Sequence, residues 1–198
     1  LLGNLALFNP DKDPFNIYAH TLLSMGPLLY IAEAILVILF LGHFIYAIMV
    51  TWQNWSARPK NYYKVKNQGH PSRKTWASVT MIYTGVIIMV FLVLHLIHFK
   101  YGPVTMYTTD NGMYIRDLYT LVHQFFGYIW NMIFYMAVMT LLGFHLSHGF
   151  WSAFQSLGIN HPFYTPVLYG LGYVFAVVMG LGFLVIPLWS YITGGGVV

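Results

Sequence analysis

The chain has 198 residues, 58% of them hydrophobic, 19% aromatic and only 7% charged, which excludes a soluble globular domain, where about a quarter of residues are charged. Its formal net charge of +4 rests on nine Lys and Arg residues, too few for a nucleic-acid-binding surface, and the absence of cysteine excludes disulfides, thiolate zinc sites and iron–sulfur ligation. We therefore expect a membrane protein, whose unusual chemical feature is nine histidines against five acidic residues.

Residues 1–8 are apolar and have neither an initiator Met nor the basic start of a signal peptide. We predict that they form the outer end of a helix that begins before residue 1. Four uninterrupted apolar runs follow, each long enough for the roughly 20 helical residues that a bilayer core requires. The predicted helices cover about residues 27–52, 76–99, 121–155 and 165–191. We expect one all-α domain over residues 1–198, a polytopic transmembrane helix bundle, with five helices in the native protein.

Most of the positive charge lies between the first two apolar runs. Six of the nine basic residues fall there: Arg58, Lys60, Lys64, Lys66, Arg73 and Lys74. Loops rich in Lys and Arg stay on the cytoplasmic side, so the loop 53–75 is predicted to be cytoplasmic. Alternation then places residues 1–8, the connection 100–117 and the C-terminus outside, and the connection 156–164 inside.

Five histidines lie within the apolar runs, where an ionisable side chain is costly and by default marks a functional site: His43, His95, His98, His145 and His148. At 1.5 Å per helical residue, His43 lies about 13 Å and His145 about 16 Å from the cytoplasmic edge. These two imidazoles are therefore predicted to be level. His95 lies about 8 Å from the outer edge and cannot share a centre with them.

Two level imidazoles on different helices suit axial ligation of a haem iron that stands between the helices of a bundle. A redox-inert metal would usually bring carboxylates or thiolates, and the spans contain only Glu33 and no cysteine. A single membrane histidine is more often a hydrogen-bonded packing residue, but a depth-matched pair favours ligation. By this argument His95 needs a partner near the outer edge, for which the helix expected before residue 1 is the source.

Spacing leaves the choice within each histidine pair open. His98 and His148 follow His95 and His145 by three residues, on roughly the same helix faces. Each is either the ligand itself or a group that contacts a haem propionate, a Trp or a backbone carbonyl. Solvated imidazoles are expected in loops and at helix ends, for His20, His70, His123 and His161. Among these, His123 is also placed to contact a quinone or a propionate at the outer surface.

Other residues of the spans have less specific roles. Gly42, Gly85 and Gly143 would let the face of a porphyrin approach a helix, although glycine is common in membrane helices. Glu33 is equally consistent with a proton relay and with an ion pair. By depth alone, contacts to haem propionates are predicted near the cytoplasmic side for Arg73, Trp76, Ser78 and Tyr83, and near the outside for Tyr101 or His123.

Four segments carry a family resemblance: residues 1–5 (LLGNL), 15–20 (FNIYAH), 84–99, which begin TG and end HLIHF, and 145–155 (HLSHGFWSAFQ). In this order they resemble the dihaem cytochrome b membrane-anchor subunit of succinate:menaquinone oxidoreductases and quinol:fumarate reductases, the class with one five-helix anchor. The resemblance covers essentially the whole chain. The last segment is its most specific part.

In that family four histidines on the first four helices ligate two b haems. The resemblance implies that His43 and His145 hold the proximal haem b, and that His95 holds the distal haem b with a histidine preceding residue 1. It favours His95 over His98 and His145 over His148. Some quinol:fumarate reductases have an acidic residue for proton transfer two positions before the fourth-helix ligand, where this chain has Gly143, so that proton path is not implied.

The resemblance implies a succinate dehydrogenase of the respiratory chain and the tricarboxylic acid cycle, in a bacterial cytoplasmic membrane. A flavoprotein subunit would oxidise succinate, and an iron–sulfur subunit would pass electrons through this chain's two haems to menaquinone; homo-oligomers of the complex fit the same class. The alternatives are a quinol:fumarate reductase or another bis-His cytochrome b, such as a hydrogenase or formate dehydrogenase anchor. A haem-free transporter with a histidine proton relay is the competing class, for which discontinuous helices, repeats and more intramembrane carboxylates are expected.

Overall fold

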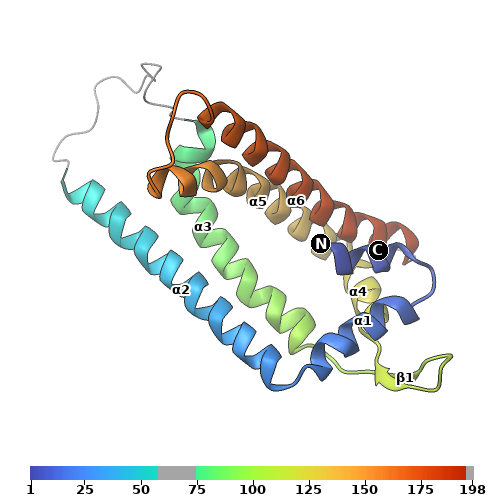
Figure 1. The fold of residues 1–198 in the computed structure, drawn as a ribbon. Coiled ribbons are helices and arrows are strands. Elements are labelled where there is room, and N and C mark those ends of the chain that lie inside the picture. Colours follow the sequence, from blue (N-terminus) through green and yellow to red (C-terminus); the bar gives the residue numbers. More distant parts are fainter. Residues whose placement is uncertain (58–74, 195–198) are drawn as a thin grey trace.

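The computed structural model describes residues 1–57 and 75–194, and it confirms the all-α fold class (Figure 1). Four helices are long and apolar enough to cross a membrane, as expected of a multi-pass membrane protein. They are α2 (Pro27–Ser56), α3 (Trp76–His95), which the π-helical turn η2 (Leu96–Lys100) prolongs, α5 (Ile129–Ser156) and α6 (Thr165–Thr193).

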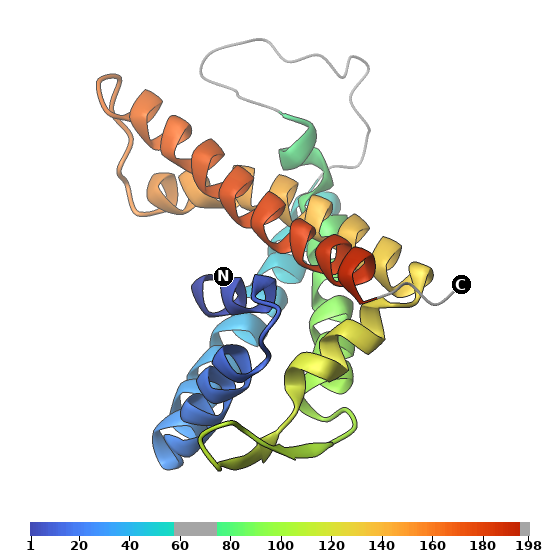
Figure 2. The same ribbon diagram turned by 90° about the vertical axis from the view of Figure 1, so that its right-hand side faces the viewer.

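Shorter elements gather at one end of the bundle. They are the 3-10 helix η1 (Leu2–Phe8), helices α1 (Asp13–Ser24) and α4 (Leu118–Phe126), and an antiparallel hairpin of β1 (Met106–Thr108) and β2 (Tyr114–Arg116). Figures 1 and 2 both show α1, α4 and the hairpin at this end, whereas the connection between α5 and α6 lies at the other. The connections 100–117 and 156–164 thus lie at opposite ends of the bundle, and which end is cytoplasmic stays a prediction. Residues 58–74 lie outside the described residues, and with them all six basic residues of the predicted cytoplasmic loop, including Arg73, and His70.

The helix predicted over residues 121–155 is divided in the structure, which corrects that expectation. Helix α4 ends at Phe126, and α5 begins after Tyr128, whose backbone is extended at φ −84° and ψ 121°. Asn131 Nδ2 donates a hydrogen bond of 2.9 Å to the carbonyl of Phe125, which satisfies an acceptor that the end of α4 leaves free. The apolar run continues through this break, so hydrophobicity does not reveal it.

Helices α5 and α6 form the most extensive contact between long helices. At their crossing Gly180 of α6 meets Gly143 of α5, because a Cβ built on Gly180 would lie only 3.2 Å from Gly143 Cα. Small residues let membrane helices approach closely. Gly143 therefore packs against α6, which corrects the expectation that it is available to the face of a porphyrin.

Helix α2 is packed much less closely than α5 and α6. None of the residues in its most apolar stretch is buried within the chain. Its contacts with the rest of the bundle include an ion pair between Glu33 and Lys100, at the end of the α3 span, and an approach of His43 to His145. Of the two roles that the sequence leaves open for Glu33, the structure shows the ion pair.

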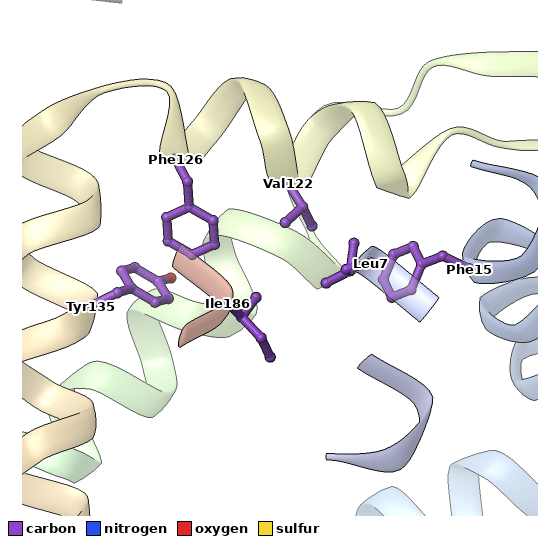
Figure 3. Packing of buried hydrophobic residues seen from close by; sticks show 6 residues of the cluster. All are labelled: Leu7, Phe15, Val122, Phe126, Tyr135 and Ile186. Atoms are coloured by element: carbon purple, nitrogen blue, oxygen red, sulfur yellow. The ribbon is translucent and has the colours of Figure 1, made fainter. Parts of the chain in front are cut away.

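An apolar cluster fastens the short elements onto the long helices. Figure 3 shows its six buried members: Leu7, Phe15, Val122, Phe126, Tyr135 and Ile186. They come from η1, α1, α4, α5 and α6. The cluster therefore joins both terminal segments of the chain to its centre.

A polar network holds the hairpin, α1 and α4 together as a cap: Asp117 joins α1 to α4, and Asp13 of α1 accepts from Tyr107 Oη and the Asp110 N–H of the hairpin. Asp117 accepts hydrogen bonds from Lys12 Nζ at 2.7 Å, from Asn16 Nδ2 at 3.1 Å and from the backbone N–H of Thr120 at 3.0 Å. Burial alone would raise the pKa of Asp117, but these hydrogen bonds outweigh burial and hold the pKa below its ordinary value. The ionised carboxylate therefore stabilises the cap.

We expect Asp117→Asn to destabilise the cap by about 2 kcal/mol, because a hydrogen bond to a charged group contributes about 1.5–3 kcal/mol. A carboxyl whose folded-state pKa is lowered stabilises the fold above its unfolded-state pKa of about 4 and loses that contribution as the pH falls through the folded-state pKa. The wild-type cap should thus loosen in acid, and the variant should respond less to pH. Amide hydrogen exchange of the hairpin measures both effects.

The control for this experiment is Asp110→Asn, since Asp110 is exposed in the same hairpin. It should leave hydrogen exchange close to that of the wild type. Equal exchange rates in the Asp117 and Asp110 variants would contradict a central role for Asp117.

Candidate functional site

His43 of α2 and His145 of α5 approach each other across the two helices; His43 is exposed within the chain and His145 is half-buried. Their ring centres lie 6.4 Å apart, and the ring planes are almost perpendicular, at 83°. The sequence predicts these two imidazoles to be level, and the structure places them side by side. The pair joins the loosely packed α2 to the closely packed α5.

The separation of the two rings fits one metal ion between them. Two metal–imidazole bonds of about 2 Å, plus about 1 Å from each bound nitrogen to its ring centre, add to about 6 Å. Within the described residues no group of three or more His, Cys, Asp or Glu side chains gathers at one point. The pair therefore suits the axial positions of a haem iron better than a zinc site, which needs three or four protein ligands.

Thr84 of α3 contacts the His145 ring at Nδ1. Its Oγ1 is 3.0 Å from His145 Nδ1, and the Thr84 residue is only 5% exposed. Because Nδ1 has this partner, Nε2 is the nitrogen left to face a ligand. A metal-binding histidine commonly has such a hydrogen-bonding partner on its second ring nitrogen.

Two glycines lie near the pair, Gly85 against the His145 ring and Gly42 beside open space. A Cβ on Gly85 would lie 3.5 Å from Cε1 of His145, and a Cβ on Gly42, the residue before His43, would have no atom within 4 Å. A flat macrocycle beside the two imidazoles would need such open helix faces. The approach of a porphyrin to Gly42 and Gly85 stays a prediction.

His95 lies in a separate, apolar environment at the other end of α3. It lines a cavity of about 490 Å³ whose walls are largely apolar, include seven Phe and Tyr side chains, and come from all four long helices, α4, α1 and η1. The ring of His95 packs against Phe91 at 5.7 Å and Phe99 at 5.2 Å. Within the described residues His95 is the only histidine that lines this cavity. The cavity falls within the roughly 300–1,000 Å³ typical of ligand pockets.

The helix widens into a π-helical turn directly after His95. The N–H of Tyr101 closes this turn by donating to the carbonyl of Leu96 at 2.9 Å. His98 lies within the turn, where its Nδ1 is hydrogen-bonded to Tyr135 Oη at 2.8 Å and its ring packs on Phe125 at 4.6 Å. Within this pair, therefore, His95 lines the cavity and His98 is held by Tyr135. Turns of this type occur frequently at functional sites.

His148, one helical turn beyond His145, packs instead against an aromatic side chain. Its ring meets Trp151 edge to face at 5.0 Å, and Trp151 in turn packs on Tyr169 at 4.5 Å. His145, not His148, is thus the member of this pair that the structure places beside His43.

No protein-family model, curated protein or solved structure matches this chain. A function is therefore inferred from the geometry of His43, His95 and His145 and from the resemblance noted in the sequence.

Of the residues predicted to contact propionates near the cytoplasmic side, Trp76, Ser78 and Tyr83 lie on α3 within the described part of the chain. Ser78 begins α3 with a capping box, in which its hydroxyl accepts from the N–H of Thr75 at 2.9 Å and donates to the carbonyl of Thr75 at 2.8 Å. Trp76 and Tyr83 project from the same helix and are exposed, and Tyr101 is exposed near the hairpin. The capping box gives Ser78 a structural role, and propionate contact by these residues stays a prediction.

His123 is buried, which corrects the expectation of a solvated imidazole there; His20 and His161 are exposed, as expected. The ring of His123 stacks on Tyr119 at 4.1 Å, and its Nδ1 lies 3.1 Å from the carbonyl of Tyr119. It borders a cavity of about 430 Å³ between residues 8–10, α4 and the end of α6. Contact of His123 with a quinone or a propionate stays a prediction.

Proposed function

We propose that this chain is the membrane-anchor cytochrome b subunit of a succinate dehydrogenase and relays electrons from an iron–sulfur subunit to menaquinone. The observation that carries the proposal is the His43–His145 pair, two imidazoles from separate membrane-spanning helices whose ring centres lie 6.4 Å apart. The sequence resemblance supports the same assignment. A competing transporter would be expected to have discontinuous spanning helices, whereas α2, α3, α5 and α6 are each continuous.

His43 and His145 would hold the proximal haem b through neutral imidazoles, and His95 would supply a ligand of the distal haem b in the aromatic cavity. When bound, haem iron supplies reversible one-electron transfer at a potential set by its axial ligands and its burial. The residues of the chain would orient the imidazoles and exclude water. Thr84 would orient the imidazole of His145, and the aromatic side chains around His95 would exclude water from that site.

The proposal includes the setting of the complex. A flavoprotein subunit and the iron–sulfur subunit would bind at the end of the bundle that holds the loop 53–75, on the cytoplasmic side of a bacterial cytoplasmic membrane. His43 and His145 lie nearer this end in the predicted topology, and His95 lies nearer the opposite end. Electrons from succinate would therefore pass from the first site toward the second and the quinone.

A spectroscopic experiment tests this function. The intact complex, purified from its native membrane, should give a reduced-minus-oxidised spectrum of low-spin b haem, should be reduced by succinate, and should contain two haems per chain by pyridine haemochrome. A preparation with intact subunits and no haem would contradict the cytochrome assignment. Haem that responds to hydrogen or formate but not to succinate would assign the chain to another bis-His cytochrome b.

A further inference from the structure

Thr84 is the only buried residue of α3 within Trp76–His95. A hydroxyl buried in a membrane-spanning helix needs hydrogen-bond partners, because an unpaired one costs free energy in an apolar environment. Thr84 has three such contacts: the carbonyls of Thr80 and Met81, each at 3.1 Å, and Nδ1 of His145 at 3.0 Å. Two of its partners belong to its own helix, and the third belongs to the candidate haem ligand.

The three contacts limit which atom donates to which. A threonine hydroxyl has one proton to donate and can accept through its lone pairs. The carbonyls of Thr80 and Met81 can only accept, whereas Nδ1 of His145 donates or accepts according to its tautomer. When the hydroxyl proton goes to either carbonyl, Oγ1 can accept from Nδ1–H of His145. In that arrangement His145 is the neutral Nδ1–H tautomer, whose Nε2 carries an available lone pair.

We propose that Thr84 is a positioning residue that fixes the tautomer and orientation of His145 for axial ligation; this inference rests on the proposed haem at His43 and His145. A metal-bound imidazole that donates its second N–H is held in orientation and becomes a more basic ligand. Gly85 assists, because it brings the backbone of α3 to the Cε1 edge of the same ring. Thr84 provides an acceptor without adding a buried charge.

The basicity of the ligand has a measurable consequence. An N–H···O hydrogen bond raises the electron density of the imidazole, which favours ferric over ferrous iron and lowers the midpoint potential. Loss of the bond should raise the potential of the haem held by His145. With a typical net hydrogen-bond contribution, the ratio of oxidised to reduced haem at the wild-type midpoint should fall by about fivefold.

The test is a potentiometric titration of the haems in three variants of the intact complex. Thr84→Val keeps the shape of the side chain and removes the acceptor, and Thr84→Ser keeps the hydroxyl. Thr80→Val is the matched control, because the Thr80 hydroxyl also donates to its own helix, to the carbonyl of Trp76 at 2.9 Å, one turn away from the Thr84–His145 contact. We expect a raised potential of one haem in Thr84→Val and wild-type potentials in the other two.

The outcomes separate the inference from the proposed function. Absence of haem from the wild-type complex would contradict the function, whereas haem with the same potential in wild type and Thr84→Val would overturn the role of Thr84 alone. Loss of haem in Thr84→Val with retention in Thr84→Ser and Thr80→Val supports the role. Loss of haem in both Thr84→Val and Thr80→Val would show that the two hydroxyls only support the helix, and would overturn the positioning role of Thr84.

Discussion

If the proposed function is correct, replacement of His145 by Ala should remove about half of the b-haem absorbance of the intact complex, because one of the two proposed bis-histidine sites would lose an axial ligand. His43→Ala should remove the same half, since both residues would hold the same iron. The double variant should lose no more haem than either single variant. Pyridine haemochrome, normalised to the flavin of the partner subunit, measures all three.

His148→Ala is the matched control for His145→Ala. It changes the same residue type on the same face of α5 one turn away, and in the structure it removes a packing contact with Trp151 and none with His43. Haem content should therefore stay close to that of the wild type. Loss of haem in His148→Ala with retention in His145→Ala would show that the ligand of α5 has been assigned one turn from its true position.

The level positions of His43 and His145 could be predicted because they depend on few quantities. The rise per residue of an α-helix is constant, and the ends of each apolar run mark the membrane edges closely enough to compare depths on two helices of the same direction. Tertiary contacts are not needed for this step. For the same reason the four spanning helices followed from hydropathy and length.

The choice within the histidine pairs could not be made from spacing, because it depends on contacts between helices. The π-helical turn after His95 changes the direction of His98, which then meets Tyr135, a residue of another helix. His145 is distinguished from His148 by Thr84, which is 61 residues away in sequence. No local pattern encodes either contact.

The cap could not be predicted from the sequence either, because it too depends on contacts between distant residues. Its central interaction joins Lys12 to Asp117, 105 residues apart, and neither the hairpin nor α1 has a run apolar enough to predict. The burial of His123 follows from the same cap, since α4 packs against the end of α6. Polar segments outside the membrane acquire their structure from distant partners, whereas the spanning helices acquire theirs from the bilayer.

Replacement of Gly180 by Val is expected to push α5 away from α6 and to lower the haem content of the site proposed at His145. A Cβ at position 180 would lie 3.2 Å from Gly143 Cα, and this backbone atom cannot rotate away. Overpacking of this kind costs about 1–3 kcal/mol. Gly143 precedes His145 by two residues, so a shift of α5 at the crossing also moves the imidazole, and a binding site tolerates only about 0.5 Å of displacement.

Gly170→Val provides the control, because Gly170 lies on the same helix and a Cβ there would have no atom within 4 Å. It adds the same side chain without a clash. Thermal stability in detergent and haem content per chain should both fall in Gly180→Val and remain unchanged in Gly170→Val. Equal behaviour of the two variants would mean that the close crossing of α5 and α6 does not control the position of His145. A fall in stability with full haem content would confine the effect of Gly180 to helix packing.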